Sequence, residues 1–419
     1  MTELAIGPRV VARLARLSFA DGETAARLLA GDALRWWDLE TNSPTSAEAA
    51  IVVAAIGRTA DPDAALSALS AMASAPDGRG LRDALELLPE LRGRLLSLLG
   101  VSTALANFLR DHPADWQLLI DDLDVAGMPA RIAAAVGASV DDPVTGTSGQ
   151  AASVTGPAAV LALRTAYHRE LVAVAGRDLA GDLDLQLVTE TLADLAAAVL
   201  QAGLAVALAA LPPGAATCRL AVVAMGKTGS RELNYVSDVD VVFVGEPVSP
   251  DGDTDAALAT ATRLAGELMN LCRGAAWQVD ANLRPEGKDG ALVRTLASHE
   301  AYYQRWASTW EFQALLKARP VAGDAALGAE YAQLVAPMVW AAAERPGFVA
   351  DVRAMRRRVV EHIPSTVGER DIKLGAGGLR DVEFAVQLLQ LVHGRADETL
   401  RTPETLRNTA RASPRWSGR

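Results

Sequence analysis

The sequence predicts an α+β fold, a predominantly helical chain with one small mixed β-sheet. Half of the 419 residues are hydrophobic but only 5% are aromatic, and this composition, dominated by alanine and leucine, favours packed helices. Short β-branched runs gather between residues 219 and 283, in the order strand, turn, strand, helix, strand. This order is typical of a small mixed sheet backed by helices and does not fit a regular βαβ array.

The length predicts more than one domain, because a single hydrophobic core rarely exceeds roughly 250–300 residues. We expect an N-terminal helical region over residues 1–120 and a sheet-containing core with its preceding helices over 121–300. A C-terminal helical domain, expected to form a bundle, follows over 301–402. Residues 403–419 are polar, contain prolines and lack periodicity, so we expect a disordered or aberrant tail.

Apolar residues three and four positions apart predict helices on both sides of the sheet. The helical segments are Pro8–Leu119, with a helix end at His112–Pro113; Pro157–Leu211, after a turn-rich loop at 141–150; Asp255–Arg273; and the chain from His299 onward, including Val359–Ile363 and Leu379–His393. The β-branched runs predict three strands, at Arg219–Met225, Val236–Val244 and Ala276–Leu283.

Charge and composition exclude several classes of protein. A net charge of −11 argues against a general affinity for nucleic acid, whose phosphates demand lysine and arginine. Cys218 and Cys272 lie in apolar surroundings, which predicts reduced, buried thiols and a cytoplasmic protein. No signal peptide is expected, and no run reaches the roughly 18 apolar residues of a membrane helix. The nearest segment, Leu195–Leu211, fits a buried helix.

Two carboxylates close the turn after the first predicted strand. Asp238 and Asp240 are one residue apart, so in a strand they share one face. Carboxylates held side by side repel each other unless a cation lies between them, and hard oxygen ligands suit Mg²⁺. Asp280 lies in the third predicted strand; alone it is typical of an exposed strand residue. Together the three could bind two metal ions about 3.5–4 Å apart, an arrangement used for displacement at phosphorus.

Candidate anion-binding groups flank these aspartates. Gly229 and Ser230 could present backbone amides and a hydroxyl to a phosphate, although the turn lacks the ending of a P-loop. Arg284 and Lys288 follow the third strand and supply positive charge.

A glycine turn opens the last predicted helix, where Lys373 and Arg380 could reach phosphates. The alternative is that Asp381 and Glu383 cap this helix and the glycines permit tight packing. Two further groups of residues are expected to be structural. The spacing of Trp306, Trp310 and Phe312 fits one helical face that packs in the core. The run Arg356–Arg358 is expected on a solvated helix face. The five histidines are expected at the surface or in caps, not in catalysis.

Four blocks of the sequence resemble the nucleotidyltransferase core of glutamine synthetase adenylyltransferase/adenylyl-removing enzymes. They are Gly226–Asp240, Val279–Gly287, Trp310–Asp324 and Ile372–Phe384. The resemblance implies a polymerase-β-like core from the N-terminal half of such an enzyme, the half that removes AMP from a tyrosine of glutamine synthetase by phosphorolysis. It also implies that Asp238, Asp240 and Asp280 are the metal carboxylates and that Gly229 and Ser230 form the glycine-rich turn.

By the same resemblance the cofactor is Mg²⁺, as two ions, with Mn²⁺ as an alternative. The substrates and products are ADP or ATP and orthophosphate. Glutamine synthetase is the protein partner, a PII-type signal protein is a second candidate, and no nucleic acid or membrane partner is expected.

Alternatives remain open. The same carboxylates could serve adenylyl transfer from ATP, and a catalytically silent domain could still bind glutamine synthetase or a PII-type protein. Enzymes of this family are commonly more than twice as long, no second core of this kind occurs here, and residues 401–419 do not continue the helical pattern. We therefore expect a truncated chain or a frameshifted gene. A nucleic-acid polymerase is disfavoured by the acidic charge.

Overall fold

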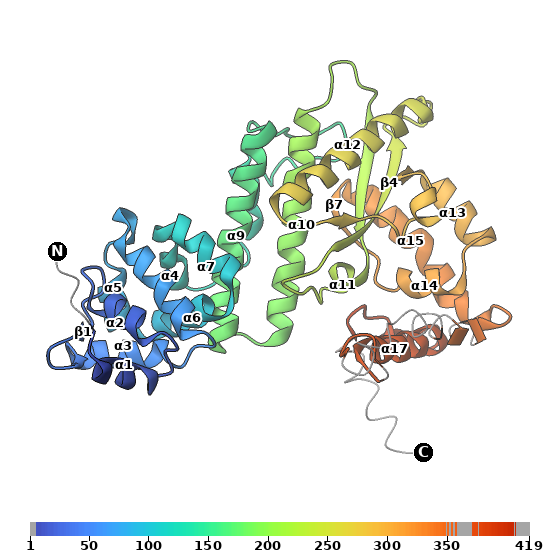
Figure 1. The fold of residues 1–419 in the computed structure, drawn as a ribbon. Helices are drawn as coiled ribbons and strands as arrows, with labels where there is room; N and C mark the ends of the chain where they lie inside the picture. Colours follow the sequence, from blue (N-terminus) through green and yellow to red (C-terminus); the bar gives the residue numbers. More distant parts are fainter. Residues whose placement is uncertain are drawn as a thin grey trace. The chain divides into compact units, whose positions relative to one another are not determined.

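The computed structural model describes residues 6–348, 350, 351, 353, 354, 357, 371–375, 377–405 and 407. The chain divides into two compact units (Figure 1). Unit 1 comprises Met1–Val125 and His168–Val188, and unit 2 comprises Ala126–Tyr167 and Thr189–Arg419. Val359–Ile363 and most of the expected tail lie outside the described residues.

Unit 1 is helical, as the apolar spacing predicts. Aspartate and serine side chains cap several of its helices; Asp21 accepts a hydrogen bond from the amide of Thr24, and Asp61 from that of Ala64. A two-stranded hairpin, which the sequence analysis did not predict, interrupts the helices. The elements are α1 Pro8–Ala15, α2 Gly22–Ala30, β1 Trp37–Asp38, β2 Ser43–Pro44, α3 Ala47–Ile56, α4 Pro62–Ser74, η1 Pro76–Gly78, α5 Leu81–Leu87, α6 Pro89–Val101, α7 Thr103–Asp111 and η2 Pro113–Leu119.

The stretch predicted as continuous helix to Leu211 forms two helices, α9 (Gly156–Ala180) and α10 (Leu185–Ala209), preceded by α8 (Met128–Ala135). The break falls at Gly181, whose φ of +81° is a conformation that glycine adopts readily. Asp184 then caps α10 by accepting from the amide of Leu187. Helix α10 is long and apolar enough to cross a membrane, but 72% of its most apolar window is buried inside the protein, as in a core helix.

Unit 2 contains a mixed sheet in the order β5–β4–β3–β7, with β6 also paired to β4. The β3–β4 and β3–β7 pairs are antiparallel, whereas β5 and β6 run parallel to β4. The strands are β3 Cys218–Ala224, β4 Val239–Pro247, β5 Val279–Asp280, β6 Val293–Arg294 and β7 Arg319–Gly323. The mixed sheet of the prediction is confirmed.

The details of the predicted strands need correction. β4 begins three residues later than predicted, and β5 has only two residues. β6 and β7 were not predicted, and β7 lies beyond residue 300, so the sheet extends into the segment assigned to a C-terminal helical domain. The chain from His299 onward is accordingly not uniformly helical.

Helices cover both faces of this sheet (Figure 1). On one face Val223 and Val242 pack with Phe312 and with Leu327 and Tyr331 of α15. Helix α12 contacts β3 and β4 but contributes nothing to this cluster, so it covers the opposite face. The remaining elements are α11 Gly226–Gly229, α12 Thr254–Ala275, η3 Gly287–Asp289, α13 Leu296–Arg305, α14 Thr309–Leu315, α15 Ala325–Ala341, η4 Ala342–Glu344, α17 Leu379–His393 and η5 Glu398–Leu400.

Two aromatic predictions fail. Phe312 is buried in the core as expected, but Trp306, the residue at the C-terminal cap of α13, is 76% exposed. Trp310 is only half-buried and lines a cavity.

Candidate metal and nucleotide site

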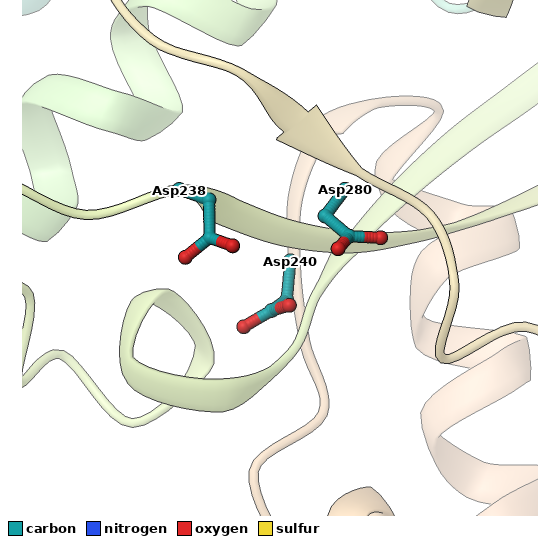
Figure 2. Close-up of side chains that lie close together, drawn as sticks. All are labelled: Asp238, Asp240 and Asp280. Atoms are coloured by element: carbon teal, nitrogen blue, oxygen red, sulfur yellow. The ribbon is translucent and has the colours of Figure 1, made fainter. Parts of the chain in front are cut away.

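Three carboxylates meet at the start of β4, as the residue spacing predicts. Asp240 is the second residue of β4 and Asp280 is its register partner on the parallel strand β5. Asp238 lies two residues before Asp240, on the same face. One ligand oxygen from each of the three aspartates lies within 4.8 Å of the others. Figure 2 shows their side chains directed into one region.

Negative charge is concentrated at this point. Burial, and then the neighbouring charges of Asp238 and Asp280, raise the pKa of Asp240 to about 6, although Lys373 and Lys317 oppose the shift. A raised carboxylate pKa means that ionisation is unfavourable without a nearby cation. The cluster therefore has the oxygen donors and the excess of negative charge that suit a divalent ion.

The glycine-rich turn packs closely against this cluster. Gly226 has a φ of +53°, and a Cβ there would lie 2.4 Å from Oδ2 of Asp240. A Cβ at Gly229 would lie 1.8 Å from the carbonyl oxygen of Lys317. Both positions require glycine because the backbone approaches other groups so closely.

Ser230, predicted to contact an anion, is fully buried in the same turn. Its hydroxyl donates to the carbonyls of Gly226 and Lys227, at 3.2 and 3.4 Å. Its amide donates to Gly226 and that of Gly229 to Met225. These groups are thus engaged within the turn, and neither Gly229 nor Ser230 lines the cavity beside the aspartates.

That cavity has a volume of about 300 Å³ and is lined by Asp238 and Asp240, at the lower end of the roughly 300–1,000 Å³ typical of small-molecule sites. Its cationic side chains, among the described residues, are Lys227, Lys317, Lys373 and Arg380. The structure thus brings the predicted Lys373 and Arg380 to the aspartates, from a segment more than 130 residues further along the chain.

Lys317 is the cation that sequence reasoning missed. Its side chain is 6% exposed, and Nζ lies 3.7 Å from Glu232 and 3.6 Å from Glu383. A lysine buried in this way needs nearby negative charge, which the two glutamates supply.

Arg284 and Lys288, also predicted to bind a nucleotide, do not line the cavity. The guanidinium of Arg284 donates to the carbonyls of Ala281, Lys288 and Gly290, at 2.8, 2.9 and 3.0 Å. These three bonds hold the loop that follows Asp280 in its conformation. Lys288 is exposed on this loop.

None of the described histidines lines the cavity. The prediction that each histidine lies at the surface or in a cap is wrong for His299, which is neither exposed nor a cap of α13. His299 is 1% exposed, Nδ1 pairs with the carbonyl of Thr295, and the ring meets Tyr331 edge-on. Burial lowers its pKa to about 4, so it is neutral at physiological pH.

Residues 92–334 match the model of the protein family described as glutamate-ammonia ligase adenylyltransferase. This match covers more than half of the chain and contains Asp238, Asp240 and Asp280. The chain belongs to this family. Residues 350–413, which contain Lys373 and Arg380, match the GlnD PII-uridylyltransferase family.

The chain is also similar to curated proteins named bifunctional glutamine synthetase adenylyltransferase/adenylyl-removing enzyme. It is 51% identical to the Streptomyces avermitilis protein over 94% of this chain and 38% of the relative. Identity to the Mycolicibacterium smegmatis protein is 50%, over 84% of this chain and 35% of the relative. Identity to the Corynebacterium diphtheriae protein is 43%, over 89% of this chain and 39% of the relative. The chain spans less than two fifths of the length of these relatives.

Proposed function

We propose that this chain is a metal-dependent nucleotidyltransferase unit that removes AMP from adenylylated glutamine synthetase by phosphorolysis. The observation that carries the proposal is the cluster of Asp238, Asp240 and Asp280 beside a cavity with several cations, in a member of the adenylyltransferase family. We further infer a polymerase-β-like core, a cytoplasmic location and glutamine synthetase as the partner. Two buried free thiols, Cys218 and Cys272, fit a reducing compartment.

The three aspartates are the residues that would hold divalent ions, two Mg²⁺ in our proposal or Mn²⁺ in their place. Their carboxylate oxygens match the preference of Mg²⁺ for hard ligands, and a cation would relieve the repulsion that raises the pKa of Asp240. When bound, such ions would stabilise the charge on the attacking and leaving oxygens of a displacement at phosphorus.

The reaction joins orthophosphate to the AMP phosphorus and breaks the bond from that phosphorus to the tyrosine oxygen. The products are ADP and tyrosine, whose hydroxyl receives the proton of hydrogen phosphate. No strong base is needed, because phosphate is already an oxyanion. We assign Lys227, Lys373 and Arg380 to binding the phosphate oxygens, a role in which cations fixed in a cavity lower the barrier by orienting and neutralising charge.

Adenylyl transfer from ATP is the second candidate, since the same aspartates and cations suit either direction and the relatives are named for both activities. A PII-type protein is a candidate regulatory partner, which the match of residues 350–413 to a PII-uridylyltransferase model favours. A third candidate is a unit that binds glutamine synthetase without turnover.

The test is to incubate the protein with adenylylated glutamine synthetase, Mg²⁺ and orthophosphate. We expect release of ADP, loss of that release in Asp238→Asn, and no change in Asp251→Asn, which alters an exposed aspartate away from the cavity. Release of AMP, or of no nucleotide, would count against phosphorolysis. Glutamine synthetase binding without any turnover, unchanged in Asp238→Asn, would identify a binding unit instead.

A further inference from the structure

A pair of glutamines lines the same cavity as the aspartates. Gln313 lies on α14 and Gln387 on α17. Gln313 is 5% exposed, and its Nε2 donates to Oε1 of Gln387 at 2.6 Å. The other end of the Gln313 amide, Oε1, is buried and has no hydrogen-bond partner. In this arrangement the end of the Gln313 amide that is left over is Oε1, an acceptor.

A buried acceptor without a partner is unfavourable, and a ligand with a matching donor would satisfy it. Adenine carries an amino group at position 6, whereas guanine carries an acceptor oxygen there. Glutamine amides pair with adenine for this reason. An acceptor facing the guanine oxygen would stay unsatisfied, which is how a polar site rejects a ligand of similar shape.

The other walls of the cavity fit the rest of a nucleotide. Trp310 and Phe384 line it and offer ring surfaces against which a base can stack. Asp240 and the cations Lys227 and Lys373 line the same cavity, so phosphates and base could be bound together.

We propose that Gln313 selects adenine over guanine by accepting a hydrogen bond from the 6-amino group at Oε1. Gln387 is the positioning residue that orients the Gln313 amide, and Trp310 and Phe384 hold the plane of the base. This inference rests on the proposed function, which supplies an adenine nucleotide to the cavity.

The experiment measures binding of three nucleotides to the whole chain with Mg²⁺ by calorimetry. The nucleotides are ADP, GDP, and purine riboside 5′-diphosphate, which lacks only the 6-amino group. We expect the wild-type protein to bind ADP about tenfold more tightly than purine riboside diphosphate, the worth of one hydrogen bond, and GDP more weakly still. In Gln313→Leu we expect the affinity for ADP to fall about tenfold. ADP and purine riboside diphosphate should then bind within about twofold of each other.

Gln304→Leu is the matched control, because Gln304 is exposed and pairs with Glu300. It should keep the wild-type preference. Equal binding of ADP and purine riboside diphosphate by the wild-type protein overturns the inference, and this comparison needs no variant to fold. A Gln313→Leu protein that keeps the full preference also overturns it. In both cases, release of ADP from adenylylated glutamine synthetase leaves the proposed function standing. A wild-type protein that binds no nucleotide and releases no ADP overturns both.

Discussion

Replacing Asp240 by asparagine should stabilise unit 2 in the absence of metal. Asp240 is partly buried beside Asp238 and Asp280, and its pKa is raised from 3.8 to about 6. Each pKa unit corresponds to about 1.36 kcal/mol, so its ionisation at neutral pH costs the folded protein up to about 3 kcal/mol. Asparagine keeps the shape of the side chain and removes the charge.

The pH dependence gives this prediction a distinct signature. A carboxyl whose pKa is higher in the folded than in the unfolded protein stabilises the fold while it is protonated, and that stability is lost as pH rises through the folded pKa. The wild-type protein should therefore lose stability between about pH 4 and pH 6 at this site. The gain in the free energy of unfolding from Asp240→Asn should be near zero at pH 4 and should reach its full value at pH 7.

The assay is calorimetric melting in EDTA at several pH values. For a unit of this size about 1 kcal/mol corresponds to about 2–4 °C, so Asp240→Asn should melt several degrees higher at pH 7.5. Added Mg²⁺ should raise the wild-type melting temperature and leave the variant unchanged, since a ligand stabilises only the state that binds it. Asp251→Asn should behave as wild type. A variant that melts at or below the wild-type temperature in EDTA at pH 7.5 would refute the reasoning.

Three further predictions concern the same unit. Gly229→Ala should lower the melting temperature, because the added Cβ would lie 1.8 Å from the carbonyl oxygen of Lys317. Overpacking of this kind typically costs about 1–3 kcal/mol, and an unchanged melting curve would contradict the close approach. Lys317→Met should reduce turnover and destabilise unit 2, because Glu232 and Glu383 lose their shared cation, whereas full activity with unchanged stability would show that the lysine is dispensable. Metal affinity should fall as pH drops below about 6, because protonated Asp240 is a poor ligand; titrations of Mn²⁺ at pH 5 and pH 7.5 measure this, and equal affinities would exclude Asp240 as a ligand.

The metal cluster was predictable because strand geometry is local. Asp238 and Asp240 share a face whatever the rest of the fold, and Asp280 only needed its strand to neighbour theirs. Strand β7 was not predictable in this way, since Arg319–Gly323 contains a proline and two small residues and forms a strand through its pairing with β3.

Cavity residues far apart in the sequence were harder to assign. Gln313 lies on α14 and Lys317 just after it, and both line the cavity beside α17. Helix α17 packs against α14, a tertiary contact that leaves no local signal in the sequence. Ser230 and Arg284 have residue types that suit phosphate binding, but in the structure their polar groups bond to backbone carbonyls nearby. The residue type alone cannot tell a side chain that binds phosphate from one that bonds to the backbone.

The most direct test of the account is the position of metal in the folded protein. Crystals soaked with Mn²⁺ and ADP should show anomalous scattering peaks within coordination distance of Asp238, Asp240 and Asp280, and these peaks should be absent in Asp240→Asn. Manganese bound elsewhere in the crystal, with none at these three carboxylates, would contradict the assignment of a metal-dependent nucleotidyltransferase site.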